Sequence, residues 1–302
     1  MAVNRGAIRD LLLPGLVAVM GKYPEIETEW PQIYRTANSR MALERAAEMR
    51  YTGLAQMKPE GGATVFDNAA GERYVYQIEH VALGLGVAMT REMLDDNLYK
   101  DKFGPMSMNL AHSFRQTKEI LHANLLNFAT TPNPNIGGDQ VAMCATNHPV
   151  DNGTYANRPT PDIGLNESAI EYALQQIRVF PDQAGLRIEA RGEKLVVPIA
   201  LQMTAARLCL ADLRPGTSNN DITAFLAVGG LKGGFIVSDY LSSPLNWFIK
   251  TTIHELVSYN RMPFELDMQV DPITGNLMLI GYERYGVGYA DPRSIWGSFP
   301  SA

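Results

Sequence analysis

The sequence has little of what a disulfide framework or a metal centre requires. Its 302 residues include only two cysteines, Cys144 and Cys209, which lie far apart and without the spacing of metal ligands. A disulfide scaffold is therefore excluded as the basis of the fold, and a reducing cytoplasm is the natural compartment. We expect each thiol to be a small buried side chain rather than a reactive group.

Long apolar runs are also missing. Residues 11–19 imitate the apolar part of a signal peptide, but Asp10 and the pair Pro14-Gly15 interrupt the pattern, and no small-x-small cleavage site follows. No other stretch approaches the roughly 20 apolar residues that span a membrane. We therefore expect an amphipathic arm at the N-terminus and no membrane partner.

Positive charge is outnumbered by negative charge. The chain has 26 Lys and Arg against 32 Asp and Glu, which gives a net charge of -6 at pH 7. Such a surface does not attract phosphate backbones, although a protein that merely encloses nucleic acid is compatible with it. Hydrophobic residues make up 46% of the chain, which is enough for a sizeable core and argues against disorder.

No complete metal-binding motif is present. The run His254-Glu255-Leu256-Val257-Ser258 resembles the zinc-binding helix of a metalloprotease, but Ser258 stands where the second histidine ligand is required. His112 and His122 lie on one predicted helix, roughly 15 Å apart along its axis, which is too far to share a metal ion.

Cofactor and nucleophile motifs are incomplete as well. Gly84, Gly86 and Met89 echo a dinucleotide-binding fingerprint, but Met89 replaces the third small residue and no βαβ unit follows. Lys232 lies among four glycines without the spacing of a phosphate-binding loop, and no G-x-S-x-G motif occurs. We predict no catalytic, cofactor-binding or metal-binding residues, and no cofactor.

The first part of the chain is predicted to be an arm followed by a hairpin. Residues 39–49 are rich in Ala, Glu, Arg and Met, which favours a helix within an arm-like region, 1–50. Turn signals that include Gly61-Gly62 precede residues 74–80, where apolar and polar side chains alternate. This pattern predicts a long β-hairpin within residues 51–88, and its polar face indicates that the hairpin projects.

A long amphipathic helix is predicted over residues 106–129, after a shorter helix capped by Thr90. The apolar side chains that share one face are Leu110, Phe114, Leu121, Leu125 and Phe128. Arg115 and Glu119 fall on the opposite face at ion-pair spacing. A helix of this length extends about 35 Å, which is unusual for a compact enzyme domain.

The rest of the chain mixes helices and strands. Residues 131–165 are rich in Pro and Gly, and an irregular stretch this long is usually functional or interaction-bearing. We expect a helix between the cap Asn166 and Pro181. Further on we expect a strand at 195–198 leading into a helix that runs to 210, a strand at 235–237, and a hairpin of 264–270 with 277–282. The predicted class is α+β.

Three segments resemble one known family. They are residues 284–298, which are the most specific, residues 194–198 before a helix, and residues 236–241 followed by Trp247-Phe248. With the order of arm, hairpin, long helix and C-terminal strands, they resemble the major capsid protein of tailed bacteriophages, whose fold is of the Hong Kong 97 type. The chain is most similar to the major head subunit of Mu-like phages and prophages.

The resemblance implies a division of the chain and a structural function. It implies an N-terminal arm at 1–50, an extended loop at 51–89, a peripheral domain at 90–164 and 263–302 with its spine helix at 106–129, and an axial domain at 165–262. Many copies would assemble into pentamers and hexamers of an icosahedral head, which encloses double-stranded DNA without sequence-specific binding. Such a protein is not an enzyme.

Portal, scaffolding and decoration proteins would be further partners, and the protein would reside in the virion after assembly in the host bacterial cytoplasm. Two alternatives stay open: an encapsulin-like nanocompartment shell, and a small-molecule enzyme with an unrecognised site. Lys58 lies in the expected loop, but no partner Asn for a covalent cross-link can be identified. We expect deletion of residues 58–73 to leave a folded protein that cannot form regular shells.

Overall fold

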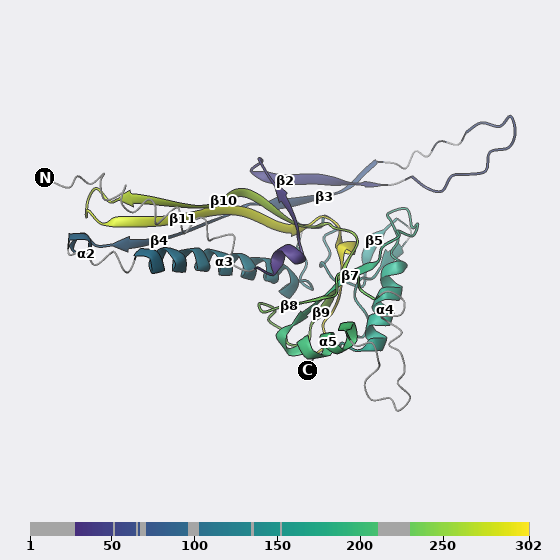
Figure 1. The fold of residues 1–302 in the computed structure, drawn as a ribbon. Coiled ribbons are helices and arrows are strands. Elements are labelled where there is room, and N and C mark those ends of the chain that lie inside the picture. The colour runs from purple at the N-terminus through teal and green to yellow at the C-terminus, as the bar shows by residue number, and fades with distance from the viewer. Residues whose placement is uncertain are drawn as a thin grey trace, which may run out of the picture.

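The computed structural model describes residues 28–301, apart from 51, 65, 67–70, 96–102, 134–135, 152 and 211–229. The amphipathic arm expected at residues 11–19 lies outside this described part. Figure 1 shows three regions: an elongated part made of a sheet with a long helix along it, a body with a second sheet and its helices, and a projecting hairpin.

The elongated part is a twisted sheet with a helix on one face. Its strands are ordered β1 (Arg35–Asn38), β10 (Leu256–Val270), β11 (Leu277–Tyr289) and β4 (Val81–Met89). β1 runs parallel to β10, and the other neighbours are antiparallel. The predicted hairpin of 264–270 with 277–282 is confirmed and is longer than expected. Its turn is closed by the amide of Gly275, which donates to the Asp271 carbonyl at 2.9 Å, and Gly275 has a φ of 74°.

Helix α3 (Phe103–Asn127) lies along this sheet and confirms the predicted long helix. Near its start Leu110 and Phe114 are buried, and the rings of Phe114 and Phe264 lie 5.0 Å apart. The predicted apolar face fails further along the helix, because Phe128 is exposed while Glu119 is buried. The short helix α2 (Arg91–Asp95) is preceded by Thr90, whose hydroxyl accepts from the Met93 amide at 3.4 Å.

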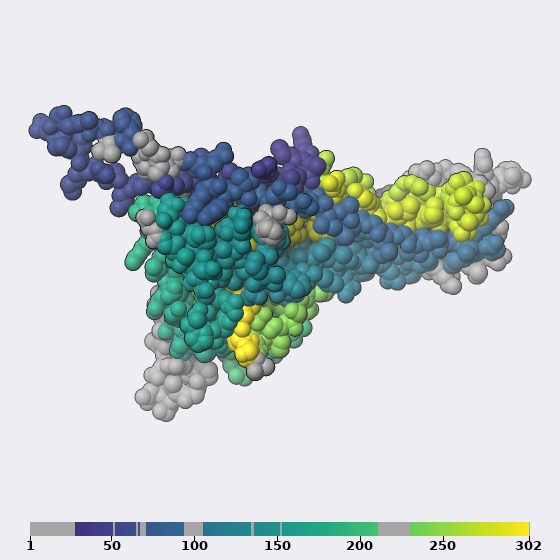
Figure 2. Space-filling model, turned by 180° about the vertical axis from the view of Figure 1, so that it is seen from behind, coloured from purple at the N-terminus to yellow at the C-terminus, as the bar shows by residue number. Residues whose placement is uncertain are grey.

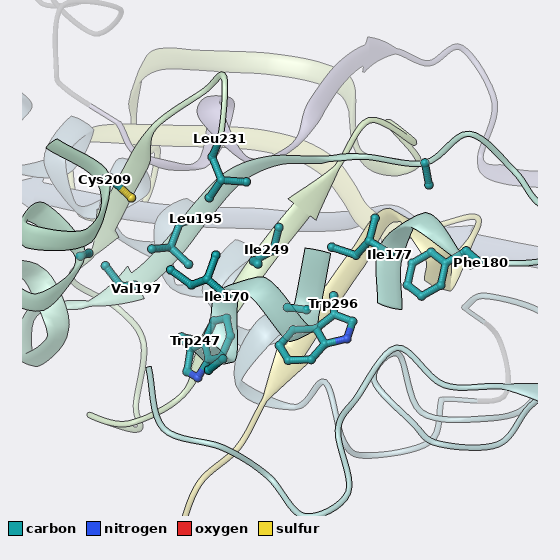
Figure 3. Close-up of a cluster of buried hydrophobic side chains, with 14 of the residues drawn as sticks. Ile170, Ile177, Phe180, Leu195, Val197, Cys209, Leu231, Trp247, Ile249 and Trp296 are labelled. Atoms are coloured by element: carbon teal, nitrogen blue, oxygen red, sulfur yellow. The ribbon is translucent and has the colours of Figure 1, made fainter. Parts of the chain in front are cut away.

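The body contains a second sheet, ordered β12 (Ile295–Ser298), β9 (Trp247–Thr251), β7 (Gly192–Pro198) and β8 (Phe235–Ser238). Helices α4 (Glu167–Arg178) and α5 (Gln202–Leu210) pack on it, and α5 follows the 3-10 turn η3 (Ile199–Leu201). The expected cap is confirmed, since the Asn166 side chain accepts from the Ala169 amide at 2.7 Å. Trp247 and Trp296 are fully buried in this core, with ring centroids 5.1 Å apart (Figure 3).

The projecting hairpin pairs β2 (Leu43–Arg50) with β3 (Gly71–Glu79). The helix predicted over residues 39–49 is therefore wrong. Intrinsic propensity is a weak preference, and pairing with β3 overrides it. The hairpin also begins earlier than expected, and β4 leaves it to join the long sheet. Two short strands, β5 (His148–Val150) and β6 (Gly153–Tyr155), form a separate pair inside the largely irregular region before α4.

The C-terminal block connects the two main parts. The chain passes from β11 through the 3-10 turn η4 (Pro292–Ser294) into β12, which pairs with β9 of the body sheet. The sequence-based boundary between residues 262 and 263 falls inside β10. The last strand thus lies with the body although the preceding hairpin belongs to the elongated part.

Candidate assembly surfaces

The residues singled out for chemistry are not brought together into a site. His254 and Glu255 lie just before β10 rather than on a helix, and they pair with different partners. The His254 Nδ1 atom is 3.5 Å from Glu193, and Glu255 is 3.7 Å from Arg35. Within the described residues, no group of three or more His, Cys, Asp or Glu side chains is placed to hold a metal ion.

The remaining motif residues also lie in structural surroundings. Gly84 and Gly86 are in the middle of β4, and Lys232 lies in an exposed turn before β8. Cys144 and Cys209 are both buried and unpaired, as expected. Burial raises the pKa of Cys209 to about 11 and that of Cys144 further, so both thiols stay protonated at neutral pH. Among the described residues, no helix has the length and apolarity to cross a membrane.

His122 is a buried hydrogen-bonding residue rather than a surface group. Its Nδ1 atom lies 2.7 Å from the Lys118 carbonyl, so this nitrogen carries the proton and donates. Nε2 then accepts from the Ser258 hydroxyl at 2.9 Å. The imidazole stacks on Trp30 with ring centroids 4.4 Å apart. Burial lowers the pKa of His122 to about 3, so the ring is neutral and ties α3 to β10.

Two carboxylates complete this junction. Glu283 forms a buried ion pair with Lys118, whose ammonium lies 4.7 Å from the centre of the Tyr285 ring. Glu119 accepts from the backbone amides of Glu29 and Trp30 at 2.8 and 3.2 Å, at the start of the 3-10 turn η2 (Trp30–Gln32). The sequence predicts that Glu119 lies with Arg115 on the polar face of the helix. This placement is wrong, because Glu119 is buried. The partners that bury it come from the N-terminal segment, which a helical pattern cannot reveal.

Asn157 is a further residue that the sequence did not indicate. The Nδ2 atom of its fully buried side chain lies 2.7 to 3.1 Å from the carbonyls of Met143, Pro292 and Ile295, which share its two N–H donors. Its oxygen accepts from the amide of Ala145 at 2.8 Å. One asparagine therefore holds the irregular region against the C-terminal block. The only hint in the sequence is a polar residue inside a Pro-rich stretch.

The segment that connects β2 to β3 is exposed, unlike the buried surroundings of His122 and Asn157. Its described residues, 52–64 and 66, are exposed except for the half-buried Gly62. Leu54 is 77% exposed, Phe66 is 83% exposed and Met57 is fully exposed. Figure 2 shows this segment standing clear of the rest of the molecule at the upper left. Apolar side chains held this far from the chain's own core are typical of a surface that another molecule covers.

The chain matches one family of known proteins. A family model described as phage capsid protein matches residues 75–297, which is well over half of the chain. The chain belongs to this phage capsid family. It is a capsid structural protein, and its location is the virion capsid. No curated protein sequence matches it significantly.

Solved structures confirm that the capsid protein has the Hong Kong 97-like α+β fold. A virus-like particle protein from Pyrococcus furiosus aligns with a TM-score of 0.54 at 12% identity, covering 95% of this chain and 98% of that one. The protein of Microbacterium phage Oxtober96 aligns with a TM-score of 0.55 at 11% identity, covering 91% and 93%. The mature capsid of bacteriophage PhiM1 gives 0.53 at 15% identity, covering 90% and 86%. The phage family favours a head protein over a nanocompartment shell.

Proposed function

We propose that this capsid protein is the major head subunit of a Mu-like phage or prophage. Many copies assemble in the host bacterial cytoplasm, through pentamers and hexamers, into an icosahedral head that encloses double-stranded DNA. Residues 284–298, which resemble the closing block of the Mu-like subunits, support this finer assignment. The acidic balance of the chain supports enclosure of DNA without sequence-specific binding.

The main support for the proposal is the exposed loop between β2 and β3. Leu54, Met57 and Phe66 gain nothing from the chain's own core, and they would contribute contact area only against a second copy. A shell built from many identical chains uses such heterologous contacts, in which one surface meets a different surface of the neighbour. An enzyme that works as a compact monomer has no use for an exposed apolar segment of this kind. Portal, scaffolding and decoration proteins are the further partners that we infer.

We propose the division into arm, extended loop, peripheral domain and axial domain that the resemblance implies, with two adjustments. Residues 1–50 form the N-terminal arm and 51–89 the extended loop, although β2 adds residues 43–50 to the hairpin. The peripheral domain comprises 90–164 and 263–302 around the spine helix, and the axial domain comprises 165–262. The pairing of β12 with β9 supports moving residues 295–298 to the axial domain.

The test is expression of the full chain followed by negative-stain imaging. The wild type should form closed shells, and shells of phage-head size exclude a nanocompartment. The variant should lack residues 53–64, because the longer deletion of 58–73 would also remove the first residues of β3. We expect this variant to be folded and unassembled. A second variant, in which residues 53–64 are replaced by Gly and Ser at equal length, shows whether the loss of side chains or the loss of loop length prevents assembly. A wild type that stays a compact monomer or dimer would overturn the proposal.

A further inference from the structure

We propose that two ionic contacts at the loop end of the paired strands β2 and β3 fix the direction in which the projecting loop points. We call these two contacts the clip, and Asp151 and Arg293 are its positioning residues. The inference deepens the proposed function and rests on it, since a fixed direction matters only if the loop must reach a neighbouring subunit.

The first contact joins both strands of the hairpin to one carboxylate. Arg50, at the end of β2, places its Nε atom 2.7 Å from Asp151. Arg73, near the start of β3, places its Nη1 atom 2.5 Å from the other oxygen of the same side chain. Asp151 lies in the tight connection between β5 and β6. A single body residue therefore holds the two strands at the end where they leave the body.

The second contact lies further back along β2. Glu48 accepts from the Gln183 side chain at 2.5 Å and from Nη1 of Arg293 at 3.3 Å. Arg293 is buried and belongs to η4 in the C-terminal block. Its guanidinium is held in place because Nε donates to the Pro181 carbonyl at 2.7 Å and the group lies 4.6 Å from the centre of the Tyr155 ring. Glu48 thus meets a guanidinium that the body has already oriented.

Two contacts at different positions prevent the hairpin from pivoting, which a single contact does not. A two-stranded ribbon is marginally stable alone and can pivot about a single point of attachment. At about 3.3 Å per residue, the eight residues of β2 span about 26 Å. Without the contacts at Glu48 and Arg50, a rotation of about 10° about the start of β2 would therefore move its loop end by about 4.5 Å, and the loop beyond it by more. That displacement equals a whole side-chain contact distance, so a loosened clip would misplace Leu54 and Met57.

The clip can be tested by measuring the direction of the hairpin. Spin labels at Glu60→Cys, in the loop, and Glu171→Cys, on α4, report the distance between the hairpin and the body, and the two native thiols are buried. Labelled chains are diluted into unlabelled chains so that only distances within one subunit are read. The test variant is Asp151→Ala with Glu48→Ala. The matched control is Asp162→Ala, which breaks the 2.5 Å ion pair to Arg158 elsewhere on the chain.

We expect a distance distribution at least about twofold wider in the test variant, because each lost pair removes a restraint on local opening. The control should match the wild type, and the share of regular shells should fall by about half or more in the test variant alone. If the double variant does not fold, Asp151→Ala by itself is used, since Asp151 lies in a surface turn. Unchanged distances and unchanged shells would overturn the clip while leaving the proposed function intact. A wild type without shells would overturn the proposed function, and the distances would still decide the clip.

Discussion

The core of the body and the loop of the projecting hairpin use apolar residues in opposite ways. In the body, Trp247 and Trp296 have no exposed surface and lie against each other between the sheet and α4. In the loop, Leu54, Met57 and Phe66 are almost entirely exposed. The first set stabilises the subunit whether or not it assembles. The second set can lower the free energy only when another molecule covers it.

This difference separates folding from assembly within one chain. Substitutions in the body core should act on the free energy of unfolding, and substitutions in the loop should act on shell formation. Between these extremes lie the polar junctions at Asn157 and His122, which connect segments that are far apart in sequence.

The largest effect on folding is expected for Trp296→Ala. The change removes a fully buried indole and its contact with Trp247, which should lower the free energy of unfolding by about 3–5 kcal/mol. Thermal unfolding of the purified chain measures this, with Trp296→Phe expected to lose clearly less. An unchanged melting temperature would contradict the assignment of Trp296 to the body core.

Asn157→Leu should have the next largest effect. It removes the two N–H donors that three buried carbonyls share and the oxygen that accepts from the Ala145 amide, and each group left unsatisfied costs about 1–3 kcal/mol. Denaturant unfolding should show a loss of at least about 3 kcal/mol in total. Asn38→Ala, on the exposed surface of β1, serves as the control and should be close to neutral. Equal stability of the two variants would show that Asn157 does not hold the C-terminal block.

His122 should give the protein an acid-sensitive junction. Because its folded-state pKa is about 3 and its unfolded pKa is about 6.5, its contribution is complete above pH 6.5 and is lost as the pH falls toward 3. Between pH 7.5 and pH 5 the wild type should lose about 2 kcal/mol through this group alone.

His122→Gln removes this component and should flatten the dependence of stability on pH, even if the variant is less stable overall. Lys118 and Glu283, which lie beside the ring, are present in both proteins and cancel in the comparison. The control is His112→Gln, whose side chain is exposed on the same helix and which should keep the wild-type profile. Parallel profiles for all three proteins would rule out a neutral, buried His122.

The smallest effect on folding is expected for Leu54→Ser with Met57→Ser. Both side chains are exposed, so the free energy of unfolding of the subunit should change by no more than about 0.5 kcal/mol. Shell formation, counted by negative-stain imaging, should nevertheless be strongly reduced. A variant that assembles normally would show that the loop's apolar residues do not contact a neighbour, and a destabilised one would show that they pack on their own chain.

The sequence by itself determined the elements whose signals are local. The alternation at 264–270 and the Asp271-Pro272 turn predicted the β10–β11 hairpin, the cap Asn166 predicted the start of α4, and strand 195–198 was placed correctly before its helix. These features depend on the period of side chains along one segment and on hydrogen bonds between near neighbours, so a single stretch of sequence contains them. Residues 284–298 also indicated the phage capsid family, because their sequence is close to the closing block of that family.

Only the tertiary structure decided which segments meet. The composition of residues 39–49 favours a helix, yet residues 43–50 form β2 because β3 supplies the hydrogen bonds of a strand. The spacing places Glu119 on the polar side of the helix, but segments from both ends of the chain bury Glu119 and His122. The last strand joins the body, and Arg293 reaches Glu48 across 245 positions of sequence. Such contacts depend on the partner that the folded chain delivers, and no local pattern of apolar and polar residues specifies that partner.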